Sequence, residues 1–325
     1  MPSDGCYVCS GWYTIVYARM ALTVVVALAV AAGTLVAQRF PDRWIAFNPL
    51  RDSAASALPG QWQWIPSSAG WADFGHYVLQ RDAEHAWLQR LGALVELFRV
   101  GSHTSLAFTT DIEFIANPDN DIRFNPRAVF WQEGLLLTLA GDDHYWQLGY
   151  YHRCKHDVDN LVIGRERSLI YGSLMARFLV PIRHEQWSGA GVVRADAYTI
   201  RQDDRTPPTD DPSTPHLRRM IGSVGGSIHL QRPIIGSLLG IYTASWIALT
   251  AFGTQKASVP LLGAGPIRTA TLGGGIAAGI AITGRTHFRI GIAWEYLPDT
   301  GINPQPEYAH LVSLTIGIVD PRAMW

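Results

Sequence analysis

A histidine and a cysteine lie two residues apart at His152 and Cys154, and Ser168 follows after a polar connection. In an extended strand, residues at i and i+2 point to the same face, so the imidazole and the thiol are predicted to lie side by side. Antiparallel pairing of the next strand across this connection would bring Ser168 beside them. A nucleophile, an adjacent base and a third group that orients the imidazole are the parts that acyl transfer needs. The same residues also have a structural interpretation, because histidine is common at membrane interfaces and a lone cysteine usually packs as a small hydrophobe.

The segments that must position these residues alternate between two kinds of side chain. From Thr104 to Phe114, mostly apolar residues at even positions alternate with small or polar residues at odd positions, and His287 to Tyr296 and Val312 to Ile318 repeat the pattern. A period of two predicts strands that separate two unlike environments. Strands of about ten residues with aromatic residues near their ends are typical of membrane barrels.

The connections between these segments alternate in length. Gly101 to His103 and Gly284 to Thr286 are short, whereas Lys155 to Arg167 and Leu297 to Tyr308 are long. Outer-membrane barrels alternate short periplasmic turns with longer extracellular loops in this way. We predict strands at about Trp71–Leu79, Trp87–Val100, Thr104–Phe114, Ala128–Leu139, Tyr145–Cys154, Ser168–Pro181, Gly191–Ile200, His216–Leu230, Gly236–Ala251, Pro266–Thr283, His287–Tyr296 and Ala309–Val319. The predicted fold is all-β: a transmembrane antiparallel up-and-down β-barrel of about 12 strands.

The composition agrees with a membrane location and argues against nucleic acid as a partner. Of the 325 residues, 48% are hydrophobic and 16% are charged, against about 25% charged residues in a typical soluble domain. The 26 basic and 27 acidic residues leave no cationic excess for binding phosphates.

One apolar run stands near the start of the chain. Ala21 to Ala37 follows Arg19 and ends in small residues, which predicts an export signal, with a single anchor helix as the alternative. We therefore divide the chain into a signal peptide or leader at 1–37, a periplasmic lead-in at 38–70 and an outer-membrane barrel at 71–325. The bacterial outer membrane is the predicted location.

The strand Tyr145 to Cys154 places the candidate site on the outside of the barrel. Trp146, Leu148 and Tyr150 continue the lipid-facing set, and His152 and Cys154 are the next two residues on the same face. The site is predicted to face lipid at the extracellular rim.

The residues around this site resemble a known family. Gly149-Tyr150-Tyr151-His152-Arg153-Cys154, followed by Ser168 to Ala176, looks like the active-site strand pair of the outer membrane phospholipase A family. That family carries Gly-Tyr-x-His-x-Ser and then Asn-x-x-Tyr-x-x-Leu-Met-Ala on a twelve-stranded barrel. The resemblance implies that His152 is the general base, that Cys154 occupies the nucleophile position and that Ser168 occupies the position of the histidine-orienting Asn. The chain departs from the family in carrying Cys for Ser and Ser for Asn.

Members of that family depend on calcium and act as dimers that bury the site between two barrels. By resemblance, Asp157, Asp159 and Glu166 are candidate calcium ligands, because calcium prefers hard carboxylate oxygens. A solvated acidic loop is the alternative explanation of these three residues. The resemblance predicts membrane phospholipids as substrates, calcium as a cofactor and a homodimer as the assembly.

A non-enzymatic barrel, either a narrow pore or a structural protein with a degenerate site, is the second functional hypothesis, since a barrel fold does not fix function. The predicted inward residues include charges of both signs, which favours ion pairing inside a narrow lumen over a single-sign selectivity ring. These residues are Arg177, Arg194, Asp196, Arg289 and Glu295.

Overall fold

The strands of this protein form one antiparallel sheet in which neighbours in sequence are mostly neighbours in space. The structure, a computed structural model, describes residues 47–51, 60–78, 86–116, 126–157, 168–203, 219–253, 269–296 and 310–320. The chain divides into two units, Met1–Leu35 and Val36–Trp325, and every described residue belongs to the second. The predicted export signal at 1–37 lies outside the described residues. No helix in the described part of the chain is long and apolar enough to cross a membrane.

The strands have the following bounds. They are β1 (Trp62–Trp64), β2 (Ser68–Val78), β3 (Trp87–Val100), β4 (Thr104–Ala116), β5 (Pro126–Ala140), β6 (Tyr145–Asp157), β7 (Ser168–His184), β8 (Trp187–Asp203), β9 (Met220–Ile235), β10 (Leu239–Phe252), β11 (Ala270–Ile282), β12 (His287–Tyr296) and β13 (His310–Val319).

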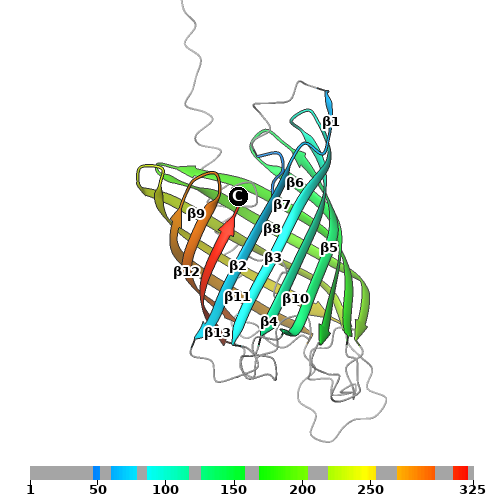
Figure 1. Ribbon diagram of the computed structural model, residues 1–325. Coiled ribbons are helices and arrows are strands. Elements are labelled where there is room, and N and C mark those ends of the chain that lie inside the picture. Colours follow the sequence, from blue (N-terminus) through cyan, green and yellow to red (C-terminus); the bar gives the residue numbers. More distant parts are fainter. Residues whose placement is uncertain are drawn as a thin grey trace, which may run out of the picture. The chain divides into compact units, whose positions relative to one another are not determined.

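The sheet closes on itself (Figure 1). Each strand from β2 to β13 pairs with the next, and β13 pairs with β2 from Val312 opposite Val78 to Val319 opposite Trp71. The short strand β1 pairs with β3 on the same side as β2, beyond a break at Ile65, whose φ is 48°. Among the described strands β2 to β13, each has a hydrogen-bonded neighbour on both sides over most of its length, so the backbone groups satisfy one another as a bilayer requires. The predicted barrel of about 12 strands is confirmed.

The two ends of the barrel differ in their connections. The strand bounds leave connections of two to four residues at one end, such as 185–186 and 101–103. At the other end the connections have eight to seventeen residues, such as 158–167 and 204–219. The alternation inferred from the sequence is therefore present, and the C-terminal end of β6 points toward the long-connection end (Figure 1).

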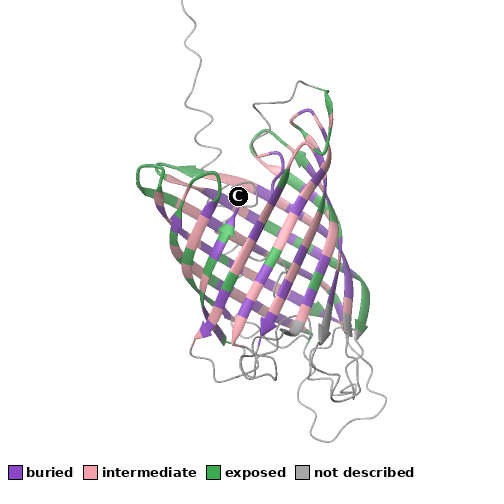
Figure 2. Ribbon diagram, in the orientation of Figure 1, coloured by how far each residue is buried: buried purple, intermediate pink, exposed green. Residues whose placement is uncertain are grey.

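The barrel is apolar on its outside and mostly polar on its inside, and the burial of the described residues largely alternates along the strands (Figure 2). Leu174 on β7 and Leu314 on β13 are more than half exposed, while Arg90 on β3 and Glu113 on β4 are almost completely buried. A soluble protein would bury the leucines and expose the charges. The inverted pattern is that of a transmembrane barrel, whose outer wall contacts lipid.

The predicted interior ion pairs are present. Arg194 donates from Nε to Oδ2 of Asp196 at 2.6 Å, and Arg90 donates from Nε to Oδ2 of Asp111 at 3.0 Å. Tyr151 adds a hydrogen bond of 2.7 Å from its hydroxyl to Asp196. Buried charges that are paired and hydrogen-bonded avoid most of the desolvation cost that they would otherwise incur.

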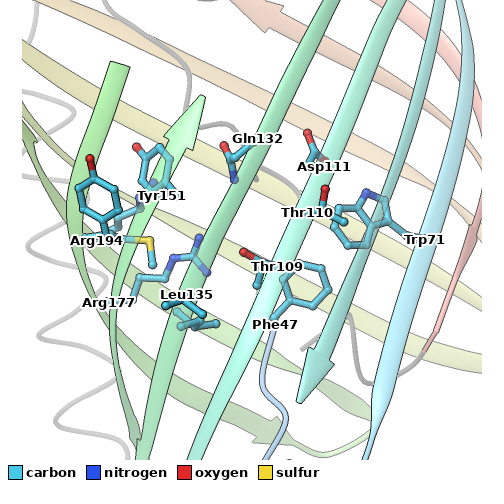
Figure 3. A pocket seen from close by; sticks show the side chains of 13 residues that line it. Phe47, Trp71, Thr109, Thr110, Asp111, Gln132, Leu135, Tyr151, Arg177 and Arg194 are labelled. Carbon is cyan, nitrogen blue, oxygen red and sulfur yellow. The ribbon is translucent and has the colours of Figure 1, made fainter. Parts of the chain in front are cut away.

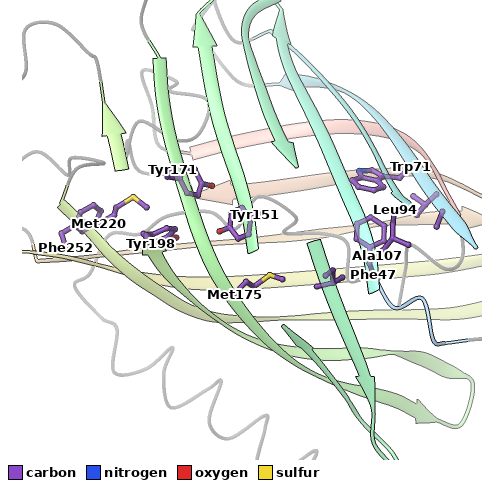
Figure 4. Packing of buried hydrophobic residues seen from close by; sticks show 13 residues of the cluster. Phe47, Trp71, Leu94, Ala107, Tyr151, Tyr171, Met175, Tyr198, Met220 and Phe252 are labelled. Carbon is purple, nitrogen blue, oxygen red and sulfur yellow. The ribbon is translucent and has the colours of Figure 1, made fainter. Parts of the chain in front are cut away.

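The lumen also holds an apolar cluster and a piece of chain that precedes the first strand. Phe47 packs its ring against Trp71 at a centroid distance of 4.6 Å. Figure 4 shows Phe47 gathered with Tyr151, Met175 and other buried side chains inside the sheet. We call residues 47–51 the inner segment, and Phe47 to Leu50 are all buried.

Hydrogen bonds hold the inner segment. Arg99 on β3 donates from Nη2 to the carbonyl oxygen of Pro49 at 2.9 Å, and Gln147 on β6 donates from Nε2 to the carbonyl oxygen of Phe47. This part of the predicted periplasmic lead-in at 38–70 thus lies against lumen-facing side chains, and β2 begins three residues earlier than predicted, at Ser68. The sequence pattern does not reveal this, because the contacts join residues up to 100 positions apart.

Two strands continue past prolines where the sequence pattern predicted an end or a turn. β7 extends through Pro181 to His184, and β9 extends through Pro233 to Ile235. Each proline lies where only one neighbour is paired, because β6 pairs with β7 only as far as Leu179 and β8 pairs with β9 only as far as Gln231. Proline is tolerated at such one-sided positions because the missing N–H is not needed there.

Candidate active site

β6 carries the candidate site on its outer face, as the alternation predicted. Gln147, Tyr151 and Arg153 point inward and are buried, whereas Trp146 and Leu148 are each 47% exposed. His152 follows on the outer face with its side chain one third exposed. Cys154, the next residue on that face, is 8% exposed.

The imidazole of His152 has a carboxylate partner on the preceding strand. Glu133 lies directly opposite His152 in the β5–β6 pairing, and its Oε1 is 2.9 Å from Nδ1 of His152. Glu133 is itself partly exposed on the outer face, with 38% of its side chain accessible. A carboxylate at Nδ1 fixes the orientation of the ring and directs Nε2 away from the carboxylate, as in the acid, base and nucleophile arrangement of acyl hydrolases.

Cys154 lies one position further along the same face. Successive outward residues on a strand are separated by about 6.8 Å along its axis, so the thiol and the imidazole are neighbours. In register, Trp131 flanks Cys154 on β5 and Ile170 flanks it on β7. The two apolar neighbours account for the low exposure of the thiol on an otherwise lipid-facing surface.

The register separates Ser168 from His152. Ser168 begins β7 opposite His156, while Ile170 lies opposite Cys154 and Gly172 lies opposite His152. Ser168 shares the outer face and is a diagonal neighbour of Cys154, at about 7–8 Å between backbones. Its side chain is not described, so its predicted role stays a prediction.

The predicted calcium ligands cannot be assembled from the described residues. Asp157 pairs through its backbone with Ala128 at the end of β6, and its side chain is not described, whereas Asp159 and Glu166 lie outside the described residues. Within the described part of the chain, no group of three or more His, Cys, Asp or Glu side chains could hold a metal ion.

An ion-pair network supports the site strand from inside the barrel. Arg153, which lies between His152 and Cys154, donates from Nη2 to Oε2 of Glu113 at 3.1 Å and approaches Asp111 at 3.5 Å. Both carboxylates are on β4, so the guanidinium reaches across β5 to hold β6. Side chains that fix the backbone in this way determine how accurately the groups on the opposite face are placed.

Glu133 is the site residue that the sequence analysis missed. It occupies an outward position between Trp131 and Leu135, both exposed to lipid. An ionisable residue among lipid-facing apolar residues is costly and therefore signals function. The sequence therefore contained a signal for Glu133. It did not reveal the register between β5 and β6 that places Glu133 opposite His152.

A cavity lies on the opposite side of the same strands. It has a volume of about 30 Å³ and is lined by Phe47, Trp71, Asp111, Arg177 and Arg194, among others (Figure 3). This space suits one or two water molecules rather than a substrate. A second cavity of about 60 Å³, lined by Asp73, Arg90 and Arg289 among others, is also too small for a phospholipid. The imidazole, the thiol and the Glu133 carboxylate lie on the outer wall instead.

The fold and the site define a transmembrane β-barrel with a carboxylate, an imidazole and a thiol on its lipid-facing surface. No known protein family and no curated protein sequence matches the chain. Among solved structures, the chain is similar to outer membrane phospholipase A from Escherichia coli, with 12% identity, a TM-score of 0.43, and coverage of 78% of this chain and 96% of that one. The outer membrane phospholipase dimer with bound calcium from Salmonella typhi has 11% identity and a TM-score of 0.42, with coverage of 83% and 94%. LpxR from Salmonella typhimurium has 10% identity and a TM-score of 0.42, with coverage of 78% and 99%. No residue of this chain takes its role from these structures.

Proposed function

We propose that the protein is a phospholipase-like acyl hydrolase of the bacterial outer membrane that acts on phospholipids from the lipid-facing side of its barrel. The observation that carries the proposal is the hydrogen bond between Glu133 and His152, one position from the thiol of Cys154 on the outer face. Ionisable groups are expensive against lipid and are retained there for function. Their location gives them direct access to a substrate that is itself a membrane lipid.

The proposed reaction has two steps. The thiolate of Cys154, formed as His152 accepts the thiol proton, attacks an ester carbonyl carbon, and a C–S bond forms. The resulting tetrahedral intermediate collapses with cleavage of the C–O bond, and His152 returns the proton to the departing lysophospholipid alcohol. Water, deprotonated by His152, then attacks the thioester, releases the fatty acid and restores the thiol. Glu133 holds the ring and stabilises the imidazolium in both steps.

We add three further parts to this proposal: a calcium site, a dimer and a role for Ser168. Asp157, Asp159 and Glu166 would bind calcium from the connection that follows β6, and a second copy of the chain would cover the outer-wall site. Ser168 would add a hydroxyl near Cys154.

The test is fatty acid release from micellar phosphatidylcholine by the purified protein, with calcium and with a chelator in parallel. Cys154→Ala and His152→Ala should each abolish release, and the double variant should lose no more than either single variant, because residues that act as one unit are not additive. Cys154→Ser should retain part of the activity.

The matched control is His310→Ala, which removes an exposed histidine on β13. It should leave hydrolysis unchanged, and all variants should keep the gel mobility shift on boiling that closed barrels show. Absence of fatty acid release by the wild type under both conditions would rule out the proposal.

One observation favours the second hypothesis, a non-enzymatic barrel. Cys154 is 8% exposed between Trp131 and Ile170, as a small packing residue would be. In that case Cys154→Ala would alter stability only, and a liposome-swelling assay would report any solute passage. The paired charges of the lumen and the buried inner segment favour a structural protein over a pore within this hypothesis.

A further inference from the structure

A second set of polar groups lies beside His152 on the outer wall, and it is built around Gly172. Gly172 on β7 lies directly opposite His152 in the β6–β7 pairing. A methyl group at this position would collide with the hydroxyl oxygen of Tyr150. The Tyr150 side chain therefore leans from β6 over β7, and its hydroxyl fills the space that the missing side chain leaves.

A bulge on β8 brings a second hydroxyl to the same place. The β7–β8 register changes from Gly172 opposite Ile200 to Ser173 opposite Tyr198, which leaves Thr199 without a partner in the ladder. Bulges re-aim a side chain and are frequent beside active sites. The hydroxyl of Thr199 donates to the Tyr150 hydroxyl oxygen at 3.5 Å, and a methyl group on Gly172 would lie 3.3 Å from Thr199 Oγ1.

The contact between the two hydroxyls is loose, because 3.5 Å exceeds the usual O–H···O distance of about 2.5–3.0 Å. It leaves the phenolic O–H of Tyr150 available to donate to a group outside the protein. Tyr150 is 38% exposed and Thr199 is exposed, so both side chains lie on the lipid-facing surface.

Resting on the proposed hydrolase function, we propose that the Tyr150 hydroxyl binds the ester carbonyl oxygen of the substrate and stabilises the oxyanion that forms when Cys154 attacks. Neighbouring strands are about 4.8 Å apart and successive outward residues about 6.8 Å. The Tyr150 hydroxyl at the Gly172 position is one strand across and one outward residue along from Cys154, which puts the two backbone positions roughly 8 Å apart. An ester carbonyl bound at both ends spans about 7 Å, with about 3 Å to the sulfur and about 3 Å to the donor, so it fits when the Cys154 side chain turns toward β7. Thr199 is then a positioning residue, and Gly172 provides the space.

The experiment compares Tyr150→Phe with the wild type on two substrates, phosphatidylcholine and a p-nitrophenyl ester that has no phosphate. An oxyanion donor acts on both esters, so kcat should fall by about 100- to 1000-fold on each while KM changes little. A residue that binds the phosphate would impair phosphatidylcholine alone and mainly through KM. That outcome, or unchanged kinetics on both esters, would overturn the proposal.

Further variants separate this role from a structural one. Gly172→Ala should displace the Tyr150 hydroxyl and lower kcat on both esters, and Tyr150→Phe with Gly172→Ala should lose no more than Tyr150→Phe alone. Tyr296→Phe, an outward tyrosine on β12 packed against His310, is the matched control and should be unchanged. A wild type that cleaves neither ester would refute the hydrolase itself, whereas an active wild type with equally active Tyr150→Phe would refute only the role of Tyr150.

Discussion

The guanidinium of Arg153 lies 3.1 Å from the carboxylate of Glu113, inside the barrel, directly behind the strand positions that carry His152 and Cys154. The pair connects β4 to β6 across β5. The ion pair thus holds the backbone of β6 from inside the barrel. This fixes the positions from which His152 and Cys154 face the lipid.

Arg153→Ala should destabilise the barrel by about 3–5 kcal/mol, because it leaves Glu113 and Asp111 buried with one cation fewer. Urea unfolding in lipid vesicles, followed by tryptophan fluorescence, measures the change in free energy of unfolding. Arg183→Ala, at an exposed position near the β7–β8 turn, should change it by no more than about 0.5 kcal/mol. Equal stability of the two variants would contradict the supporting role of Arg153.

Glu133→Gln keeps the shape of the side chain but removes the charge that orients His152. We expect kcat for ester hydrolysis to fall by about 10- to 100-fold with little change in KM, since orienting the imidazole supplies part of the roughly 10²- to 10⁴-fold that a general base contributes. Glu185→Gln, on the exposed β7–β8 turn, is the control. A rise in KM with unchanged kcat would indicate that Glu133 binds the substrate instead.

Leu148→Arg should cost about 2–4 kcal/mol, because Leu148 faces the bilayer. Alternation alone predicts that a charge at Gln147, on the lumen face, is tolerated. The structure corrects this expectation: Gln147 is fully buried, donates to Thr138 Oγ1 at 3.1 Å and lies beside Arg177. Gln147→Lys should therefore also destabilise, by about 1–3 kcal/mol from the unmade hydrogen bonds. The same urea titration distinguishes these outcomes, and full stability of Gln147→Lys would show that the lumen is open there.

Phe47→Ala should cost about 3–5 kcal/mol, because it removes a buried ring packed against Trp71. Phe74→Ala removes an outward ring that is 51% exposed, and it should cost less because the surrounding lipid is as apolar as the side chain it replaces. If both variants unfold at the same urea concentration, the inner segment contributes nothing to the stability of the barrel.

The sequence predicts the bounds of the strands better than it predicts which side chains pair between neighbouring strands. The bounds of β3 and β12 coincide with those expected from the alternation, since each strand separates lipid from a packed lumen. The ends of β7 and β9 were predicted too early because each strand continues past a proline, Pro181 or Pro233. A strand tolerates proline where one neighbouring strand has already ended, and the sequence does not show where that is. The pairing of Glu133 with His152 depends on the register between β5 and β6. Alternation cannot predict that register, because a shift of one strand by two residues leaves the same side chains facing outward.

The inner segment has a consequence for what the barrel encloses. Its backbone is bound by Arg99 on β3 and Gln147 on β6, and the pairing of β2 with β13 closes the sheet around it. Residues that precede the first strand are therefore part of the filling of the lumen, and the seam between β2 and β13 encloses them.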